Sequence, residues 1–509
     1  MSNIITGHAT EAATKYYADD IWKKNPKISP DSWRLLEGLT VGKVGIGTYR
    51  MDGADKQDIA LKKALTSGCN LIDTSANYMD EDSEFLIGDV LIEMISKGSI
   101  RRDEIVIVTK GGYLQGQNLE RFVENPPEET VEVSDYLWHC IHPAFLKDQI
   151  NRSMDRMNID TIDVYLLHNP EYYLDFAYAT EMDMQVATEE YYRRIQEAFV
   201  FLEKQVMEGV IGCYGISSNT LVAEKDAPNH TDLARIAECA TFAAQEAWGR
   251  RKRSSFRVIQ MPLNILEPSA IRNINTSAKI IDGEEEVSTL ELASRMNLSI
   301  LTNRPLNSFP EGGGVFRLAE GEINQSMVLD ETMDQLTDLE QEISGILGGW
   351  PAFNDESVPN LSLDGPEVIK QIENSVHFDH MDMNFFRPQA ALMDHVLEHL
   401  IQQQPDKEET LGEIRDRYNT LAKRLLTAVK HLAHRKDIES CKPIDMEIRN
   451  RMPEKWRDAP LQQLAINTIA STPGVTCVLC GLRSPEYLKD VTAIYEKGDF
   501  ADVAGIIAG

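Results

Sequence analysis

Short apolar runs alternate with amphipathic helical stretches along most of the chain. Each apolar run is nearly continuous, as expected for a strand that is buried on both faces. The runs cover residues 41–49, 70–78, 104–112, 162–170, 209–219, 257–266, 298–307 and 474–482. Strands that alternate with helices indicate a parallel sheet with right-handed crossovers. Eight such units favour a closed α/β structure, the (β/α)8 or TIM barrel, over an open doubly wound sheet.

Two segments interrupt this alternation. Residues 113–143 form a polar stretch after the third strand, and residues 309–454 separate the seventh strand from the eighth. The second segment is far longer than an ordinary connection, opens with FPEGGGVF and then becomes mainly helical. The predicted organisation is therefore a polar N-terminal extension, a barrel and a large mainly helical insertion. Their boundaries are 1–36 for the extension, 37–309 with 455–509 for the barrel, and 310–454 for the insertion.

The strongest helical pattern of the insertion covers residues 407–436. Apolar side chains there recur in steps of three and four, at positions 411, 414, 418, 421, 425, 429 and 432. This spacing places them on one stripe of a helix. Such a stripe packs on its own domain or on a partner, so oligomer formation through the insertion stays open.

Composition and charge narrow the possible partners. The 509 residues carry 51 basic and 81 acidic side chains, a net charge of −30. A general affinity for nucleic acid or an anionic membrane is not expected, because phosphate binding relies on a basic field. The sequence has no run of 18 apolar residues and no recognisable targeting pattern, so a cytoplasmic protein without a membrane span is expected.

The cysteines and histidines do not predict a metal site. Seven cysteines are spread without a framework spacing, which favours a thiol-reducing compartment. Cys477 and Cys480 form a CxxC pattern, but they lie in an apolar strand and no second pair accompanies them. The segment HFDH at 377–380 is better explained as a polar loop than as a cation site.

Four reactive side chains fall at or just after the carboxyl ends of predicted strands, where barrel enzymes build their active sites. They are Asp73, Tyr78, Lys110 and His168. Alone, each is more often a packing residue, but the four together make chemical sense. A free phenol has a pKa of about 10, and a nearby ammonium such as that of Lys110 lowers it. Asp73 would pair with that ammonium, and a neutral His168 would orient a carbonyl oxygen.

These residues lie in motifs that resemble the aldo-keto reductases. The matching segments are GIGTYR (45–50), IDTSANYMDEDSEFLIG (72–88), VTKGG (108–112), IDVYLLHNP (162–170), GISSNT (215–220), VIQMPLN (258–264), TNRPLN (302–307) and PGVTCVLCGLRSPEYLKD (473–490). The resemblance implies hydride transfer between a nicotinamide cofactor and a carbonyl or alcohol carbon of a small molecule. Tyr78 would be the general acid in reduction and His168 would position the substrate oxygen.

The resemblance also implies a set of cofactor-binding residues. They are Thr48, Ser217, Ser218, Gln260, Arg304, Leu306, Gly481 and Arg483. NADP(H) is expected more than NAD(H), although Tyr487 stands where many members have arginine and Asp490 lies close by. NAD(H) therefore stays open, with Arg483 as a compensating positive charge.

Other readings of the same residues stay open. A regulatory subunit that binds the cofactor without turnover would keep the barrel, and the large insertion would then serve a partner. A lyase or isomerase would use Lys110 as a Schiff-base amine. In the enzyme, the substrate walls would come from variable loops, where the candidates are Tyr113, Trp138 and Tyr172.

Overall fold

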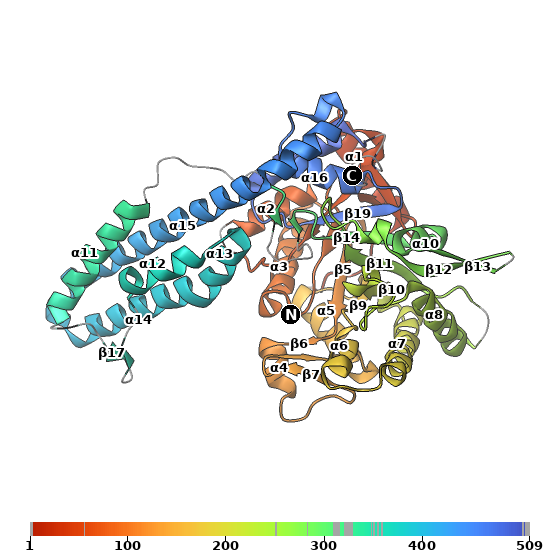
Figure 1. Cartoon of the computed structure of the whole chain (residues 1–509), viewed down its shortest axis with the longest axis horizontal. Coiled ribbons are helices and arrows are strands. Elements are labelled where there is room, and N and C mark those ends of the chain that lie inside the picture. Colours follow the sequence, from red (N-terminus) through yellow and green to blue (C-terminus); the bar gives the residue numbers. More distant parts are fainter. Residues whose placement is uncertain are drawn as a thin grey trace. The chain divides into compact units, whose positions relative to one another are not determined.

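The structure is a computed structural model of the whole chain (Figure 1). It describes residues 4–54, 56–249, 252–281, 283–308, 316–319, 329–347, 349, 352–353, 356–357, 360–500 and 503. The chain divides into two compact units, residues 1–305 with 463–509 and residues 306–462. The three segments expected from the sequence have somewhat different limits, and their role as separate domains stays a prediction.

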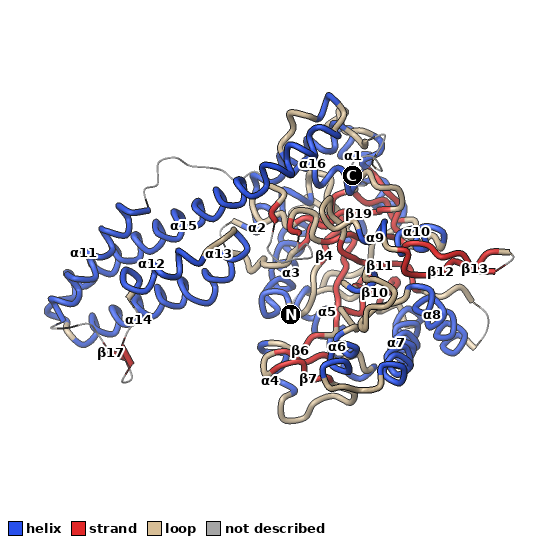
Figure 2. Tube along the Cα trace, viewed as in Figure 1, coloured by secondary structure: helices blue, strands red, loops and turns tan. Residues whose placement is uncertain are grey.

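The first unit is built on a closed barrel of eight parallel strands (Figure 2). In chain order these are β3 (Val44–Gly47), β4 (Leu71–Asp73), β5 (Val106–Gly111), β9 (Ile162–His168), β10 (Ile211–Ser217), β11 (Phe256–Pro262), β14 (Ser299–Asn303) and β19 (Val475–Cys480). Each strand pairs with the next, and β19 closes the barrel by pairing with β3. The predicted (β/α)8 barrel is confirmed, and each strand lies inside one of the eight apolar runs except β11, which begins one residue before its run.

Helices follow or precede the strands as the alternating pattern requires. They are α2 (Gln57–Leu65), α3 (Asp82–Ser96), α5 (Pro143–Met157), α6 (Tyr172–Ala179), α7 (Met184–Met207), α8 (Leu233–Trp248), α9 (Ser269–Arg272), α10 (Thr289–Arg295), α16 (Leu461–Ala470) and α17 (Leu488–Lys497). Helix α5 shows how local sequence sets the limits. The His142 side chain accepts a hydrogen bond from Ala144 N, Pro143 occupies the first turn, and Asn158 ends the helix in the left-handed conformation.

The N-terminal extension is part of the barrel unit. It contains α1 (Glu11–Lys24) and β1 (Trp33–Leu36), which forms a hairpin with β2 (Leu39–Gly42) of the barrel segment. Ala9, Leu36 and Val41 are buried in the same apolar cluster as the barrel interior. The polar composition of residues 1–36 therefore conceals a few apolar side chains that anchor the segment.

The polar stretch after β5 forms a small sheet of its own. Strands β6 (Tyr113–Leu114), β8 (Leu137–His139) and β7 (Val131–Ser134) pair antiparallel in that order. Helix α4 (Gly116–Phe122) lies between β6 and β7 in the chain. A second antiparallel pair, β12 (Ile274–Ile280) and β13 (Gly283–Ser288), precedes α10.

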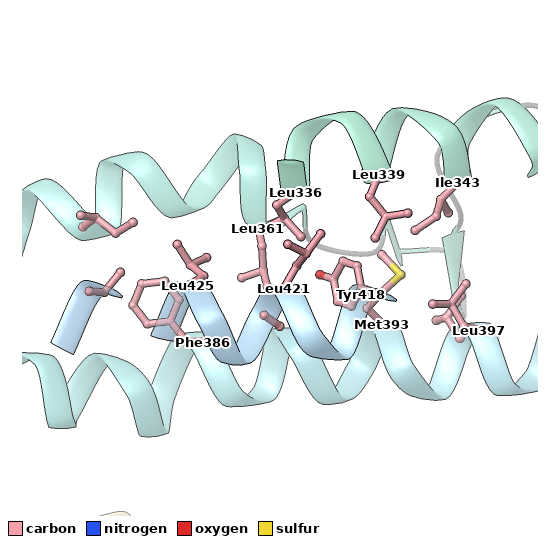
Figure 3. Close-up of a cluster of buried hydrophobic side chains, with 14 of the residues drawn as sticks. Leu336, Leu339, Ile343, Leu361, Phe386, Met393, Leu397, Tyr418, Leu421 and Leu425 are labelled. Atoms are coloured by element: carbon pink, nitrogen blue, oxygen red, sulfur yellow. The ribbon is translucent and has the colours of Figure 1, made fainter. Parts of the chain in front are cut away.

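The second unit is mainly helical and has its own core, which confirms the predicted helical insertion between strands seven and eight (Figure 3). Its helices are α11 (Leu329–Leu347), α12 (Leu361–Gln371), α13 (Ser375–Met381), α14 (Arg387–Gln403) and α15 (Glu408–Arg451). It also holds the short strands β15 (Asn307–Ser308), β16 (Phe316–Arg317), β17 (Ala352–Phe353) and β18 (Glu356–Ser357). The segment FPEGGGVF falls almost wholly outside the described residues.

The stripe predicted on residues 407–436 packs inside this unit. Ile414, Tyr418, Leu425 and Val429 of α15 are buried in the helical core. The expectation of a polar loop at 377–380 is wrong, because these residues form the body of α13. Its Asn374 cap accepts a hydrogen bond from His377 N, a signal that a search for metal ligands overlooks. Among the described residues, no helix is long and apolar enough to cross a membrane.

Candidate active site

The alternation of side chains along the strands places the reactive residues inside the barrel. Val108, Leu166 and Val258 belong to the apolar interior cluster. Because side chains alternate between the two faces of a strand, the residues two positions further on face the same interior. Those residues are Lys110, His168 and Gln260. By the same alternation, Asp73 faces the interior because Leu71 does, and Ser217 faces it because Cys213 does. The carboxyl end of the interior is therefore polar.

Lys110 is the centre of this polar layer. Its Nζ donates hydrogen bonds to Asp73 Oδ2 at 2.8 Å, to the Thr74 carbonyl at 2.9 Å and to the Tyr78 hydroxyl at 3.1 Å. The Lys110 and Asp73 side chains are buried, whereas Tyr78 is partly exposed. Three of the four residues singled out in the sequence are thus joined by hydrogen bonds.

Burial and charge set the protonation of these groups. Burial opposes the charge on Lys110, but Asp73 and Tyr78 raise its pKa above the ordinary value. With three acceptors around Nζ, the amine remains an ammonium at neutral pH. Burial raises the pKa of Tyr78, and the charge of Lys110 offsets only part of that rise. The expected influence of the ammonium has the predicted sign, but burial outweighs it and the phenol keeps its proton.

His168 completes the group as a neutral imidazole. Burial and the charges of Lys110 and His139 lower its pKa well below the ordinary value. The ring contacts that of Tyr78 edge to face, with centroids 6.0 Å apart. Ser75 Oγ lies 3.0 Å from His168 Nδ1, which leaves Nε2 for other partners. Sequence reasoning missed Ser75, although it lies inside the IDTSANY motif.

Gln260 links the reactive group to a candidate carboxamide site. Its Nε2 donates to Asp73 Oδ1 at 2.7 Å, and its Oε1 accepts from Ser217 Oγ at 2.9 Å. Asn303 Oδ1, at the end of β14, is buried without a hydrogen-bond partner in the described part of the chain. Amide and hydroxyl groups beside an unsatisfied buried amide fit a planar carboxamide such as that of nicotinamide.

The other predicted cofactor residues lie around the carboxyl ends of the strands. Thr48 Oγ1 donates to the Asp73 carbonyl at 3.2 Å, and Ser218 is buried directly after β10. Arg304 follows β14 with a left-handed backbone, φ 57°, and donates to Asn219 Oδ1 at 3.0 Å. Two further residues, Gly481 and Arg483, follow the end of β19.

Leu306, also predicted to bind the cofactor, is the first residue of the second unit and is partly buried. It is therefore described with that unit, and its predicted contact with a cofactor stays a prediction.

Aromatic rings surround His168. The Tyr113 ring lies 4.6 Å from that of His168 and 5.5 Å from that of Tyr172, both edge to face. The role of Tyr113 and Tyr172 in a substrate wall stays a prediction, as does that of Trp138, which packs on a small cluster with Leu114 and Phe145.

The sequence did not single out two other buried groups of this region. His139 Nε2 lies 2.7 Å from the His168 carbonyl, and burial lowers the pKa of His139 to about 4. Glu171 accepts a hydrogen bond from Asn219 N at 2.8 Å, and burial raises its pKa to about 7. Both residues lie in loops or short strands where neither periodicity nor a motif marks them.

The geometry defines a class: a parallel barrel with a tyrosine, a lysine, an aspartate and a histidine gathered at the carboxyl end of its strands. The model of the aldo/keto reductase family matches residues 39–247, which include the first five barrel strands and all four of these side chains. Residues 39–247 of this chain are therefore similar to the aldo-keto reductase family.

Individual relatives are distant. The chain is 27% identical over 128 residues to aldose reductase B of Dictyostelium discoideum, covering 25% of this chain and 32% of that protein. It is 25% identical over 139 residues to the NADH-specific methylglyoxal reductase of Escherichia coli, covering 26% of this chain and 39% of that protein. The chain thus spans about a third of the length of these curated relatives.

Among solved structures, the chain is similar to the holo form of aldo-keto reductase AKR11C1 from Bacillus halodurans. The two are 17% identical, the alignment covers 94% of this chain and 95% of that one, and the TM-score is 0.45.

Proposed function

We propose that this protein is a nicotinamide-dependent oxidoreductase that acts on the carbonyl or alcohol carbon of a small molecule. The observation that carries the proposal is the hydrogen bonding of Lys110 Nζ to both Asp73 and the Tyr78 hydroxyl. This arrangement places a protonated phenol beside a fixed positive charge, which is what a proton donor to a developing alkoxide requires.

The roles of the side chains follow from their contacts. When bound, the nicotinamide supplies or accepts the hydride. In reduction, Tyr78 donates its hydroxyl proton to the substrate oxygen, and Lys110 stabilises the phenolate that remains. His168 orients the substrate oxygen by donating from Nε2–H, in the tautomer whose Nδ1 accepts a hydrogen bond from Ser75 Oγ. Ser217 and Gln260 would hold the cofactor carboxamide.

The phosphate end of the cofactor is part of the proposal. NADP(H) is the expected form, with Arg483 as the residue that would face the 2′-phosphate. The same region holds Tyr487, and Asp490 accepts a hydrogen bond from Gln463 Nε2 at 2.8 Å. The preferred cofactor can be identified by measuring the Kd values for NADPH and NADH, both in the native protein and in Arg483→Met. A selective loss of NADPH affinity supports the assignment, and equal Kd values for the two cofactors in the native protein contradict it.

The contacts of Lys110 disfavour a Schiff-base mechanism. A nucleophilic amine must be deprotonated and free to approach a carbonyl carbon. Here Nζ is surrounded by three acceptors, and the neighbouring Asp73 favours its charged form. A reducing, cytoplasmic compartment stays part of the proposal, and the seven free, buried cysteines agree with it.

The decisive experiment follows NAD(P)H oxidation against a panel of aldehydes, ketones and aldoses. The native protein is compared with Tyr78→Phe and with Tyr136→Phe, which removes a hydroxyl from an exposed ring. We expect Tyr78→Phe to lower kcat at least about a hundredfold, in the range of general acid catalysis, while cofactor affinity is kept. Tyr136→Phe should match the native protein.

The other outcomes are equally informative. Cofactor binding without turnover across the panel would favour a regulatory subunit over an enzyme. Failure to bind either nicotinamide cofactor, measured by fluorescence quenching, would exclude the proposal altogether.

A further inference from the structure

The chain that follows Tyr78 has an unusual backbone. Met79, Asp80 and Glu81 all have positive φ values, 48°, 53° and 84°, and none of them is glycine. Each such residue costs about 1–2 kcal/mol in a left-handed conformation. Three in succession persist only where the surrounding structure fixes them.

Glu81 is the residue of this segment that is held most firmly. Its carboxylate is buried and accepts hydrogen bonds from both terminal nitrogens of Arg121, one of them at 2.9 Å. Arg156 NH1 lies 3.3 Å from the same carboxylate. Burial would raise the pKa of Glu81, but these two guanidinium groups lower it below the ordinary value. Glu81 is therefore ionised and doubly paired.

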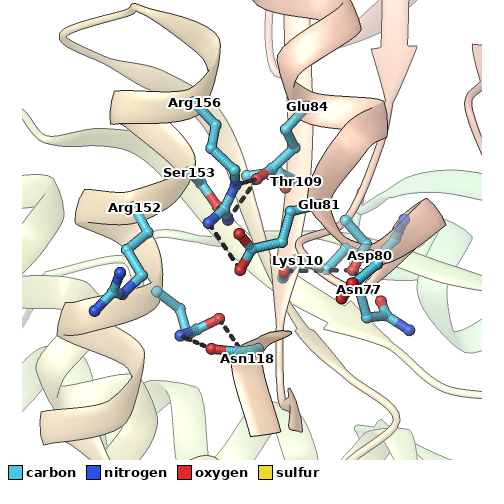
Figure 4. A network of polar contacts seen from close by, with 12 residues as sticks. Asn77, Asp80, Glu81, Glu84, Thr109, Lys110, Asn118, Arg152, Ser153 and Arg156 are labelled. Carbon is cyan, nitrogen blue, oxygen red and sulfur yellow. Dashed lines mark hydrogen bonds and ion pairs between the residues drawn. The ribbon is translucent and has the colours of Figure 1, made fainter. Parts of the chain in front are cut away.

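The same network also reaches the strand that carries Lys110, the residue that donates a hydrogen bond to the Tyr78 hydroxyl. Figure 4 shows Arg156 between Glu81 and Glu84. Arg156 Nε donates to Glu84 at 2.7 Å, and Glu84 accepts from Thr109 Oγ1 at 2.6 Å. Thr109 directly precedes Lys110, and Glu81 lies three residues after Tyr78. One buried network thus fixes the chain on both sides of the acid–base pair.

Helix α4 supplies the outer part of this network. In addition to Arg121, the loop at its start ties down the residues on either side of Tyr78. Asn77 Nδ2 donates to Gln115 Oε1 at 3.1 Å, and Gln117 N donates to Asp80 Oδ1 at 2.9 Å. Gly116 makes this approach possible, because a Cβ at that position would lie 2.1 Å from Asp80 Oδ1.

We propose that α4 is a positioning element for Tyr78, with Arg121 and Glu81 as its principal positioning residues. The proposal rests on the proposed function of Tyr78 as the proton donor. In the described part of the chain, the phenol oxygen has one hydrogen bond, from Lys110, so its direction depends on the backbone that carries it. We call the contacts of α4 and the loop at its start with Asn77, Asp80 and Glu81 the brace. The brace holds that backbone in a conformation that the sequence of 79–81 does not favour.

The test measures the Tyr78 phenol itself. All 16 tyrosines of the full chain are replaced by 3-fluorotyrosine, and the ¹⁹F signal of Tyr78 is assigned with Tyr78→Phe. The groups that face the phenol are Asp73, Lys110, Tyr49 and His168. Among these, Lys110 is the one that lowers the phenol pKa, so displacement from Lys110 should raise it.

Two variants loosen the brace by different means, and each has a matched control. Arg121→Met removes the ion pair, whereas Arg235→Met removes an arginine of similar exposure that pairs with Glu189 on another helix. Gly116→Ala pushes α4 away from Asp80, whereas Gly98→Ala places a Cβ in open space at a similar positive φ. Arg121→Lys tests rescue by a conservative cation.

We expect Arg121→Met and Gly116→Ala to raise the ¹⁹F-detected pKa of Tyr78 and to lower kcat at least about tenfold, with KM and the cofactor Kd unchanged. Arg121→Lys should recover part of both, and the two controls should match the native protein. A Tyr78 pKa identical to that of the controls overturns the proposal, whatever happens to kcat. A raised pKa in a protein that turns over no carbonyl supports the brace and defeats the proposed function instead.

Discussion

The barrel interior has an apolar part, called the lower layer here, and a polar part at the carboxyl ends of the strands, called the upper layer. The same strands supply the side chains of both. Val108, Leu166 and Val258 fill the lower layer with aliphatic side chains. Two residues further along the same strands, Lys110, His168 and Gln260 form a hydrogen-bonded polar layer. Within each of these strands, a step of two residues therefore separates an aliphatic side chain from a polar one.

From this difference we expect that substitutions can change stability and reactivity separately. The lower layer stabilises the fold through burial and van der Waals contact. The upper layer buries charges, which adds little net stability and leaves a large cost when one partner is removed. Substitutions in the two layers should consequently affect different observables.

Removing the charge at the centre of the upper layer should have the largest effect. Lys110→Met leaves Asp73 buried without its cation, so we expect kcat to fall at least about a hundredfold and stability to fall by about 3 kcal/mol. The double variant Asp73→Asn/Lys110→Met should regain much of the stability but none of the activity. Urea unfolding and steady-state kinetics test both statements. Equal instability of the single and double variants would show that the pair is not energetically coupled.

A truncation in the lower layer should give the complementary result. Leu166 is fully buried, and Leu166→Ala should lower the free energy of unfolding by about 2–5 kcal/mol. Leu166 pairs in register with Lys110 on β5, but its side chain is aliphatic and takes no part in the hydrogen bonds of Lys110, so kcat per folded molecule should stay within about twofold of the native value. Leu35→Ala, at a side chain 67% exposed, is the control for denaturation experiments. A large loss of kcat in Leu166→Ala would mean that the layers are not separable.

Loss of the hydrogen bond between Ser75 and His168 should lower kcat less than the loss of Lys110 does. Ser75→Ala removes the contact with His168 Nδ1 together with the hydrogen bond to Asn77 Oδ1 at 2.7 Å, and it frees the imidazole to rotate, so kcat should fall about tenfold, equivalent to about 1.4 kcal/mol. Cofactor affinity should not change, and the melting temperature should fall by a few degrees at most, because the lost hydrogen bonds are worth about 1–3 kcal/mol. Substrate kinetics beside cofactor titration would show this pattern, and an unchanged kcat would remove Ser75 from the site.

His139 should give the smallest effect, visible only as a pH dependence. Burial lowers its pKa to about 4 from an ordinary value of about 6.5, so the unfolded chain binds its proton first. The folded state therefore loses stability as the pH falls from about 6.5 towards about 4. His139→Gln should flatten this part of the melting temperature profile. An unchanged slope in that variant would assign the acid sensitivity to other groups.

Much of the fold could be predicted because its signals are local and repeated. Each strand is an apolar run, and α15 carries an unbroken stripe from Leu411 to Val429. The small sheet of β6, β7 and β8 was missed because its strands are short and β7 is largely exposed. The anchoring of residues 1–36 was missed because the buried face of α1 consists mostly of small or polar-tipped side chains, which make a weak apolar pattern. These residues are Ala13, Thr14, Tyr17, Ala18 and Ile21.

The site was predictable only where a motif marks it. Asp73, Tyr78, Lys110 and His168 stand at strand ends in a recognisable order, and the hydrogen bonds found between three of them agree with that order. Arg121 and Arg156 gave no signal, because they lie on a short polar helix and on an amphipathic helix, where a charged residue is unremarkable. Their importance depends on tertiary contacts with Glu81, which no spacing in the sequence reveals.

The pairing of β14 with β19 has a practical consequence for protein engineering. Thr302 and Val478 remain in register although roughly 170 residues separate the two strands along the chain. Closing so long a connection costs only about 2.5 kcal/mol more than closing one of about 10 residues, since the cost grows logarithmically. The connection between these strands is thus a suitable site for exchanging one inserted domain for another. A foreign domain grafted there in place of residues 306–462 needs only termini that lie close together for the barrel to close around it.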